Sequence, residues 1–181
     1  ICTGTGEMAQ ILRKNASPHT WVLGLDFSKD MIMEAKRRRG GAFDFLVLGD
    51  AGELPFKDET FELVTTAFAT RNLEESKKGL LSTLKEFHRV LRPGGRLIIL
   101  ETSQPDLMLL KKIFHLFVKI TVMPLGAILT GSRQSYSYLS YSIRHFLTAP
   151  ELKRTLREAG FKRVEVYPLF FGAAAIHKAF K

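Results

Sequence analysis

Two glycines and an acid near the start of the chain have the types and spacing needed to hold a nucleotide. Gly4 and Gly6 flank Thr5 directly before a segment with helical character, and Asp26 follows them. Glycine lets the backbone approach a ligand closely, and an acid about 20 residues further on can bind ribose hydroxyls. The same pattern also suits a tight structural turn, because glycine serves turns generally. The pattern alone leaves a nicotinamide dinucleotide, another adenosine compound and a plain turn open.

A second acid, Asp50, ends an apolar segment and is followed by Ala51. At the carboxyl end of a strand, its carboxylate can accept a hydrogen bond from an adenine amino group. The alternative role for an aspartate at this place is to cap a turn. Two acids around one glycine loop favour an adenosyl ligand without a pyrophosphate over a dinucleotide.

Bringing these residues together requires a parallel sheet, and the chain alternates apolar strand segments with helical ones. We expect helices over residues 7–15, 29–39 and 75–91, and strands over residues 21–26, 43–48, 61–68 and 96–101. Ser28 precedes the second helix as its N-cap, and a Pro-Gly-Gly turn at 93–95 separates the third helix from the fourth strand. This alternation predicts an α/β fold with a mostly parallel sheet.

The C-terminal segment does not continue the alternation of single strands and helices. A helix opens at Thr148 and Pro150 and runs to Ala159, and two β-rich segments, 163–169 and 173–180, follow it. Too few residues separate these two segments for a crossover helix, so they must pair antiparallel. We therefore expect the last strand to run against an otherwise parallel sheet.

Composition narrows the class of protein and its partners. The chain has 181 residues, 45% of them hydrophobic, which suits a single domain over residues 1–181 with one buried core. One cysteine leaves no disulfide framework and suits the cytoplasm, and five histidines without short ligand spacings predict no metal site. A net charge of +9 and a pI near 9.8 indicate an anionic partner, either nucleic acid or an anionic membrane surface.

Longer stretches of the chain resemble a known family. They are GTG at 4–6, FATRN at 68–72, RVLRPGG at 89–95, LETSQP at 100–105 and YSYLSYSI at 136–143. At these residues the chain resembles the class I S-adenosylmethionine-dependent methyltransferases, and within them the ubiquinone/menaquinone biosynthesis C-methyltransferases. The resemblance covers nearly the whole chain and implies a Rossmann-like fold, S-adenosylmethionine as the cofactor and a polyprenyl quinol as the substrate. Such relatives also carry an N-terminal region ahead of the glycine loop, so the chain resembles a family member cut within its first motif.

The resemblance also implies a set of cofactor contacts. They are Gly4, Thr5 and Gly6 in the glycine loop, Asp26 on the ribose, Asp50 and Ala51 at the adenine, and Ala67, where many relatives carry serine. Phe27 and Met31 are apolar candidates for the walls around the adenine ring, with ordinary core residues as the alternative.

Arg71 and Asn72 are the residues that we expect to act on the substrate. S-adenosylmethionine carries an electrophilic methyl group, so the enzyme must align an acceptor carbon with it and exclude water. A quinol carbon becomes nucleophilic when the neighbouring hydroxyl loses its proton, and a cation or base just beyond the strand over residues 61–68 would assist. The alternatives are that Arg71 is a surface cation and that Asn72 caps a helix.

Tyr136, Tyr138 and Tyr141 lie in the stretch that resembles the family's substrate-side signature, and we expect them to contact the quinol. The alternative is that they are packed residues with one satisfied polar atom. They belong to residues 106–147, which we interpret as inserted helices on the substrate or membrane side.

Residues 108–123 are predicted to form an apolar helix in which Lys111, Lys112, His115 and Lys119 share one face. These charges interrupt the segment too often for a transmembrane span, which needs about 20 apolar residues. We expect a peripheral helix at the inner membrane face or a lid over an apolar ligand. A core helix of the domain is the alternative.

Nucleic acid is the weaker candidate for the anionic partner. The dense basic run at 36–39 closes a helix, where cations favour the helix dipole, and no aromatic residues interleave it. We therefore expect no nucleic acid partner. Methylation of RNA or of another small molecule, and an inactive cofactor-binding fragment, stay as alternatives, and a homodimer is left open.

Overall fold

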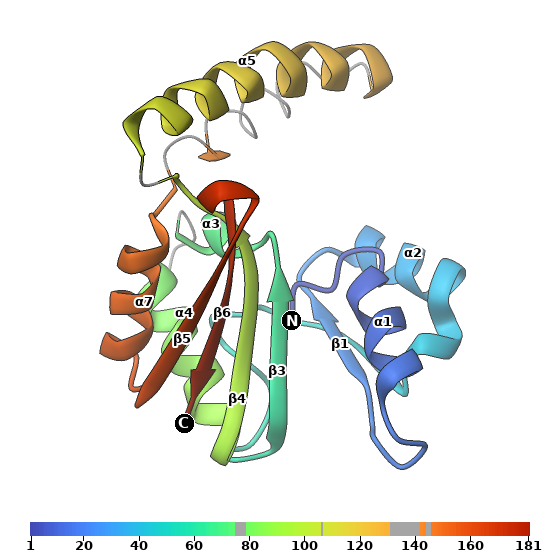
Figure 1. The fold of residues 1–181 in the computed structure, drawn as a ribbon. Coiled ribbons are helices and arrows are strands. Elements are labelled where there is room, and N and C mark those ends of the chain that lie inside the picture. Colours follow the sequence, from blue (N-terminus) through green and yellow to red (C-terminus); the bar gives the residue numbers. More distant parts are fainter. Residues whose placement is uncertain (75–78, 106, 131–141, 144–145) are drawn as a thin grey trace.

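The chain folds into two groups of strands flanked by helices. The computed structural model describes residues 1–181 apart from 75–78, 106, 131–141 and 144–145 (Figure 1). The first part contains helix α1 (Glu7–Asn15), strand β1 (Leu23–Asp26), helix α2 (Lys29–Arg39), the short 3-10 helix η1 (Gly40–Ala42) and strand β2 (Phe45–Leu48). The middle contains β3 (Phe61–Ala67), α3 (Thr70–Glu74), α4 (Gly79–Val90) and β4 (Leu91–Thr102). The last part contains α5 (Met108–Thr130), α7 (Ala149–Glu158), β5 (Arg163–Leu169), the 3-10 helix η2 (Phe170–Gly172) and β6 (Ala174–Phe180).

Strand pairing confirms the predicted α/β fold and its antiparallel end. β1 and β2 pair in parallel, and a separate four-stranded sheet has the order β3-β4-β6-β5. β3 and β4 are parallel, whereas β6 runs antiparallel to both β4 and β5. Only η2 and Ala173 separate β5 from β6, so the chain reverses direction there as the short connection predicts.

The first residues of the chain lie between the two groups of strands. The Thr3 amide donates to the Leu25 carbonyl oxygen over 3.0 Å, and the Ile1 nitrogen donates to the Thr65 carbonyl oxygen over 2.8 Å. Figure 1 shows the N-terminus between β1 and β3. This arrangement brings the carboxyl ends of β1 and β3 to the glycine loop, which begins directly after Thr3.

The main core lies between the four-stranded sheet and the helices α4 and α7 (Figure 1). Its most buried apolar side chains, each at most 1% exposed, include Leu84, Phe87, Leu97, Ile99 and Leu156. Complete burial of such side chains from one face of the sheet explains why this part of the chain forms a stable platform.

Side-chain caps start two helices where the sequence predicts them. The Met31 amide donates to Ser28 Oγ over 3.4 Å at the start of α2. At the start of α7, the Thr148 amide donates to the Glu151 carboxylate over 2.8 Å, and the Glu151 amide donates to Thr148 Oγ1 over 3.4 Å. This reciprocal capping box satisfies amides that have no partner within the helix.

Of the predicted helix over 75–91, the structure describes α4 from Gly79 to Val90, and residues 75–78 lie outside the described part of the chain, while a separate short helix, α3, covers Thr70–Glu74. Gly79, at the start of α4, has a φ of +72°, which the interior of a right-handed helix cannot accommodate. A helix continuous through Gly79 is therefore excluded.

The predicted Pro-Gly-Gly turn lies inside the bounds of β4. Leu91 pairs with Phe61 and Arg96 pairs with Leu63, so residues 92–95 bulge out between two paired positions. A side chain at Gly95 would come within 2.8 Å of the Arg92 carbonyl oxygen, so the bulge requires glycine there.

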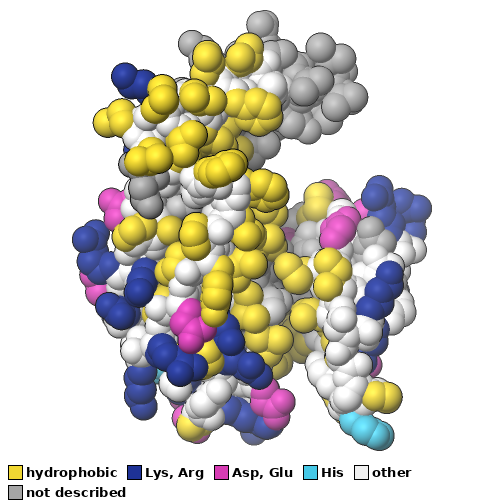
Figure 2. Space-filling view, in the orientation of Figure 1, with side chains coloured by type: hydrophobic (Ala, Val, Ile, Leu, Met, Phe, Trp, Pro, Cys, Tyr) yellow, Lys and Arg dark blue, Asp and Glu magenta, His cyan; other side chains and the backbone are white. Residues whose placement is uncertain are grey.

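Helix α5 exposes a different face from the one that its charges suggest. Lys111 and His115 are half-buried, and His115 Nε2 lies 2.6 Å from Gln104 Oε1. The outward residues Leu109, Ile113, Leu116 and Ile120 are between 55% and 70% exposed, and Figure 2 shows hydrophobic side chains gathered over α5. The core-helix alternative is therefore wrong for this face, because a core helix would bury it. The side chain of Lys119 lies outside the described residues.

In the described ranges, no helix combines the length and the apolar character that crossing a bilayer requires.

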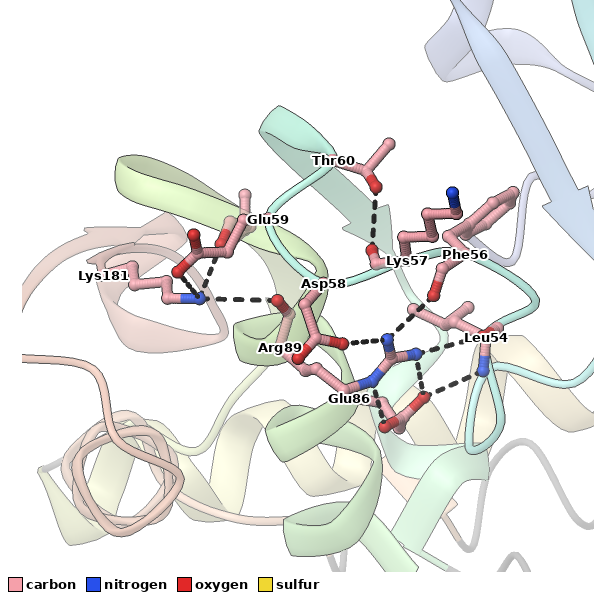
Figure 3. A network of polar contacts seen from close by, with 10 residues as sticks. Leu54, Phe56, Lys57, Asp58, Glu59, Thr60, Glu86, Arg89 and Lys181 are labelled. Carbon is pink, nitrogen blue, oxygen red and sulfur yellow. Dashed lines mark hydrogen bonds and ion pairs between the residues drawn. The ribbon is translucent and has the colours of Figure 1, made fainter.

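Arg89 connects helix α4 to the loop that follows β2. Its guanidinium donates to the carbonyl oxygens of Leu54 and Phe56, over 3.0 and 2.8 Å, and to the carboxylates of Glu86 and Asp58 (Figure 3). Hydrogen bonds to Glu86 and then to Asp58 raise the pKa of Arg89 above its ordinary value, so this cation is permanent. The network holds the loop that carries the acid predicted to bind adenine.

Candidate cofactor and substrate site

The glycine loop turns through two residues in the left-handed region. Gly4 has a φ of +53° and Gly6 a φ of +91°, conformations that side chains rarely allow. The Gly6 amide donates to the Thr3 carbonyl oxygen over 2.9 Å and closes the turn. Thr5 Oγ1 donates to the Glu7 carboxylate over 2.7 Å. The loop therefore presents its backbone directly ahead of the N-terminus of α1, where backbone amides can meet a ligand.

Asp26 lies beneath this loop and holds it. The residue is 6% exposed, and its Oδ2 accepts a hydrogen bond from the Gly4 amide over 2.9 Å. Its Oδ1 accepts from the Ser28 amide over 3.0 Å. A carboxylate has about four lone-pair sites, so these two bonds leave capacity for ribose hydroxyls. The amide of Gly49 donates to the Asp26 carbonyl oxygen over 3.0 Å, which brings the end of β2 alongside.

A cavity of about 530 Å³ opens beside the glycine loop, and its lining includes Gly4, Thr5, Met31, Ala67 and Phe68. Small-molecule sites are usually about 300–1,000 Å³ in volume. A larger cavity, of about 810 Å³, lies between β1 and β3, and none of the predicted site residues lines it. Ligands of open α/β sheets bind at the carboxyl ends of the strands, so the smaller cavity is the candidate cofactor site.

The loop after β2 carries Asp50 and Ala51, the two residues predicted to contact adenine. Asp50 Oδ1 accepts a hydrogen bond from the Gly52 amide over 2.8 Å, so Asp50 caps this turn, and its contact with adenine stays a prediction. Ala51 is buried. Phe27 is 79% exposed and Met31 is 40% exposed, so neither is an ordinary core residue. Of these two, Met31 lines the cavity.

Arg71 is half of a buried ion pair. Its Nη1 donates to Glu101 Oε1 over 2.8 Å, and the two side chains are 10% and 1% exposed. The surface-cation alternative is therefore wrong. Asn72 is exposed and lies inside α3, which begins at Thr70, so it does not cap the start of that helix.

Sequence reasoning missed two residues of the site, Glu101 and Phe68. Glu101 could have been found from the sequence, because it is an acid near the end of the strongly apolar strand β4. Phe68 lines the cavity, and its backbone has a φ of +54°. No sequence pattern predicts that conformation for a phenylalanine. The predicted substrate residues Tyr136, Tyr138 and Tyr141 lie outside the described residues, so their contacts stay a prediction.

Cys2 also lines the cavity, but its chemistry is that of a neutral thiol. Burial raises the pKa of the Cys2 thiol to about 11. The thiolate is the reactive form of cysteine, so Cys2 is not an activated nucleophile near neutral pH.

Solved structures share the fold of this chain. An S-adenosylmethionine-dependent methyltransferase from Aquifex aeolicus matches with a TM-score of 0.66 and 20% identity over 99% of this chain and 78% of that one. A second such methyltransferase, from Methanosarcina mazei, matches with a TM-score of 0.64 and 19% identity over 99% and 89%. The [4+2]-cyclase SpnF matches equally well, with a TM-score of 0.68 and 19% identity over 99% and 72%. At these identities the likeness establishes the fold of the class I methyltransferases and no particular activity.

Sequence relatives establish the family. The chain belongs to the ubiE/COQ5 methyltransferase family, whose model matches residues 1–181. It is 40% identical over 185 residues to the demethylmenaquinone methyltransferase of Geobacillus kaustophilus (strain HTA426), covering 100% of the chain and 77% of the relative. It is 39% identical over 182 residues to that of Staphylococcus aureus (strain JH9), covering 100% and 74%.

The chain is therefore an S-adenosylmethionine-dependent methyltransferase, and the nicotinamide alternative is set aside. Its residues fit this cofactor. The left-handed glycine turn allows close approach of the backbone, Asp26 offers a buried carboxylate for ribose hydroxyls, and the adjacent cavity has a suitable volume.

Proposed function

We propose that this enzyme methylates a ring carbon of a polyprenyl quinol, with demethylmenaquinol as its substrate in menaquinone biosynthesis. The two relatives named demethylmenaquinone methyltransferase align with the whole chain, which supports this substrate. A polyprenyl methoxybenzoquinol of ubiquinone biosynthesis is the second candidate, because the chain resembles both branches of the family.

The observation that carries the proposal is a buried cation just beyond the carboxyl end of β3, at Arg71. Bound S-adenosylmethionine supplies an electrophilic methyl group on a sulfonium. Arg71 would stabilise the phenolate that forms when the hydroxyl beside the acceptor carbon loses its proton. Asn72 would orient the ring oxygen. The acceptor carbon would gain the methyl group as the bond between the methyl carbon and the sulfur breaks, leaving a neutral thioether. The ring hydrogen would then leave as a proton, and the phenolate oxygen would regain the proton it had lost.

We expect the enzyme to transfer labelled methyl groups from S-adenosylmethionine to demethylmenaquinol. The assay measures label in the extracted quinone, with a polyprenyl methoxybenzoquinol and total RNA as parallel acceptors. Label in RNA and in neither quinol would overturn the substrate class and the prediction that nucleic acid is not a partner. The homodimer stays a prediction that light scattering on the same sample can test.

The apolar stripe of α5 supports a peripheral position at the inner, cytoplasmic membrane face, where a polyprenyl quinol resides. Leu109, Ile113, Leu116 and Ile120 recur at the spacing of one helical face and are exposed. Lys112, which is also exposed, stands beside this stripe. An apolar face edged by an exposed lysine suits the boundary between headgroups and acyl chains of anionic lipids.

Leu116→Glu should reduce binding to vesicles that contain anionic lipid. Burying one leucine side chain contributes about 1.5–3 kcal/mol, so the partition coefficient should fall about 10-fold or more. Cosedimentation with anionic and neutral vesicles, at low and high salt, measures the change. Met33→Glu is the matched control, because Met33 is 58% exposed but belongs to α2. Equal binding by both variants would remove α5 from the membrane contact.

A further inference from the structure

The ion pair between Arg71 and Glu101 leaves the Arg71 Nε donor without a partner among the described residues. Arginine and a carboxylate often pair through two parallel hydrogen bonds. Here the Arg71 guanidinium gives Glu101 one bond, from Nη1 to Oε1 over 2.8 Å, while Oε2 accepts from Thr70 Oγ1 over 2.9 Å. Arg71 Nε is buried and has no partner among the described residues. The guanidinium therefore keeps a donor that the described part of the protein does not satisfy.

Glu101 is fixed in place by several donors at once. Its Oε1 also accepts from the amide and the hydroxyl of Thr102, over 2.8 and 3.0 Å. Its Oε2 lies 3.4 Å from the backbone amide of Arg71. The carboxylate therefore contacts Arg71 at both its backbone and its guanidinium, and it cannot rotate without breaking bonds to β4 and α3.

We propose that Glu101 is the positioning residue for methyl transfer, a role that rests on the proposed function of Arg71. Glu101 acts through Arg71 and does not touch the substrate. By accepting from Nη1 and from the Arg71 amide, Glu101 restricts where the guanidinium can lie, and it leaves the other guanidinium donors for the phenolate oxygen of the substrate. A displacement of about 1 Å can cost about 10²-fold in rate, so losing this orientation lowers kcat.

Glu101→Gln separates this role from a structural one. The amide keeps the size of the side chain but turns one acceptor into a donor, facing donors of Thr70 or Thr102. We expect kcat to fall about 10- to 100-fold, with the affinity for S-adenosylmethionine changed by about twofold or less. Glu101→Asp is a second variant that keeps the charge if the glutamine variant folds poorly. Glu165→Gln on β5 is the acid-to-amide control, and its kcat should match that of the wild type.

Chemical rescue tests the contact directly. Arg71→Ala removes a side chain that is nine-tenths buried, so added guanidinium ion can occupy the vacated space beside Glu101. We expect guanidinium to restore activity to Arg71→Ala at least about fivefold better than to the double variant Arg71→Ala/Glu101→Gln. Equal rescue of both variants would overturn the positioning role.

Nitrogen-15 NMR of the Arg71 Nε–H group supplies a readout that needs no turnover. We expect a sharp resonance in the wild type, because Glu101 holds the guanidinium, and a broadened or shifted one in Glu101→Gln. A wild type that methylates no quinol would contradict the proposed function. The spectrum would still test whether Glu101 holds the Arg71 guanidinium. Wild-type activity together with an unchanged kcat and an unchanged resonance in Glu101→Gln would defeat the positioning role alone.

Discussion

Arg71→Ala is expected to lower kcat by about 10²-fold or more while the affinity for S-adenosylmethionine stays near that of the wild type. The physical reason is that, in the proposed mechanism, the guanidinium would stabilise charge that develops on the quinol oxygen in the transition state. Arg71 pairs with Glu101 and does not belong to the glycine loop, so the cofactor contacts of that loop are retained. Steady-state methyl transfer to demethylmenaquinol measures kcat, and calorimetric titration measures cofactor affinity.

Removing Arg71 also leaves the buried carboxylate of Glu101 without its cation, which costs about 3–5 kcal/mol of folding stability in comparable pairs. Arg71→Lys is therefore needed beside the alanine variant, since it keeps the charge but loses the planar arrangement of donors. Arg92→Ala is the control, because Arg92 is 54% exposed and pairs with Glu62 on the surface. Folded Arg71 variants with kcat within about threefold of the wild type would exclude transition-state stabilisation by this residue.

Asp26→Ala should weaken binding of S-adenosylmethionine by about 1.5–3 kcal/mol, the usual contribution of a hydrogen bond to a charged group. Protein contacts are lost together with the ribose contact, because the carboxylate that would meet the ribose also accepts from the Gly4 and Ser28 amides. Asp26→Asn keeps the size of the side chain and should show a smaller loss.

Calorimetric titration with S-adenosylmethionine and with NAD measures this effect and the preference for the adenosyl ligand. Asp30→Ala is the matched control, since Asp30 is an exposed acid in the first turn of α2. If Asp26→Ala binds the cofactor as tightly as Asp30→Ala does, Asp26 does not belong to the cofactor site.

The kind and order of the helices and strands could be predicted from the sequence, because they depend on residues that are neighbours in the chain. The cap at Thr148 starts α7, and the short connection at 170–172 forces β5 and β6 to run antiparallel. The glycine loop is equally local, since its two glycines adopt left-handed conformations. The ends of strands were less predictable where pairing with a neighbouring strand decided them. Leu91 pairs with Phe61, so β4 begins ahead of the turn that the Pro-Gly-Gly sequence predicts.

The contacts of the site required the folded structure, because they join residues that are distant in sequence. Asp26 and Gly4 are 22 positions apart, and Glu101 and Arg71 are 30 positions apart. Which acid meets which donor depends on the order of the strands, and no local pattern encodes that order. The same holds for α5. Its periodicity separates charged from apolar residues, but the side that faces water follows from the contact of His115 with Gln104, a residue that lies outside the helix.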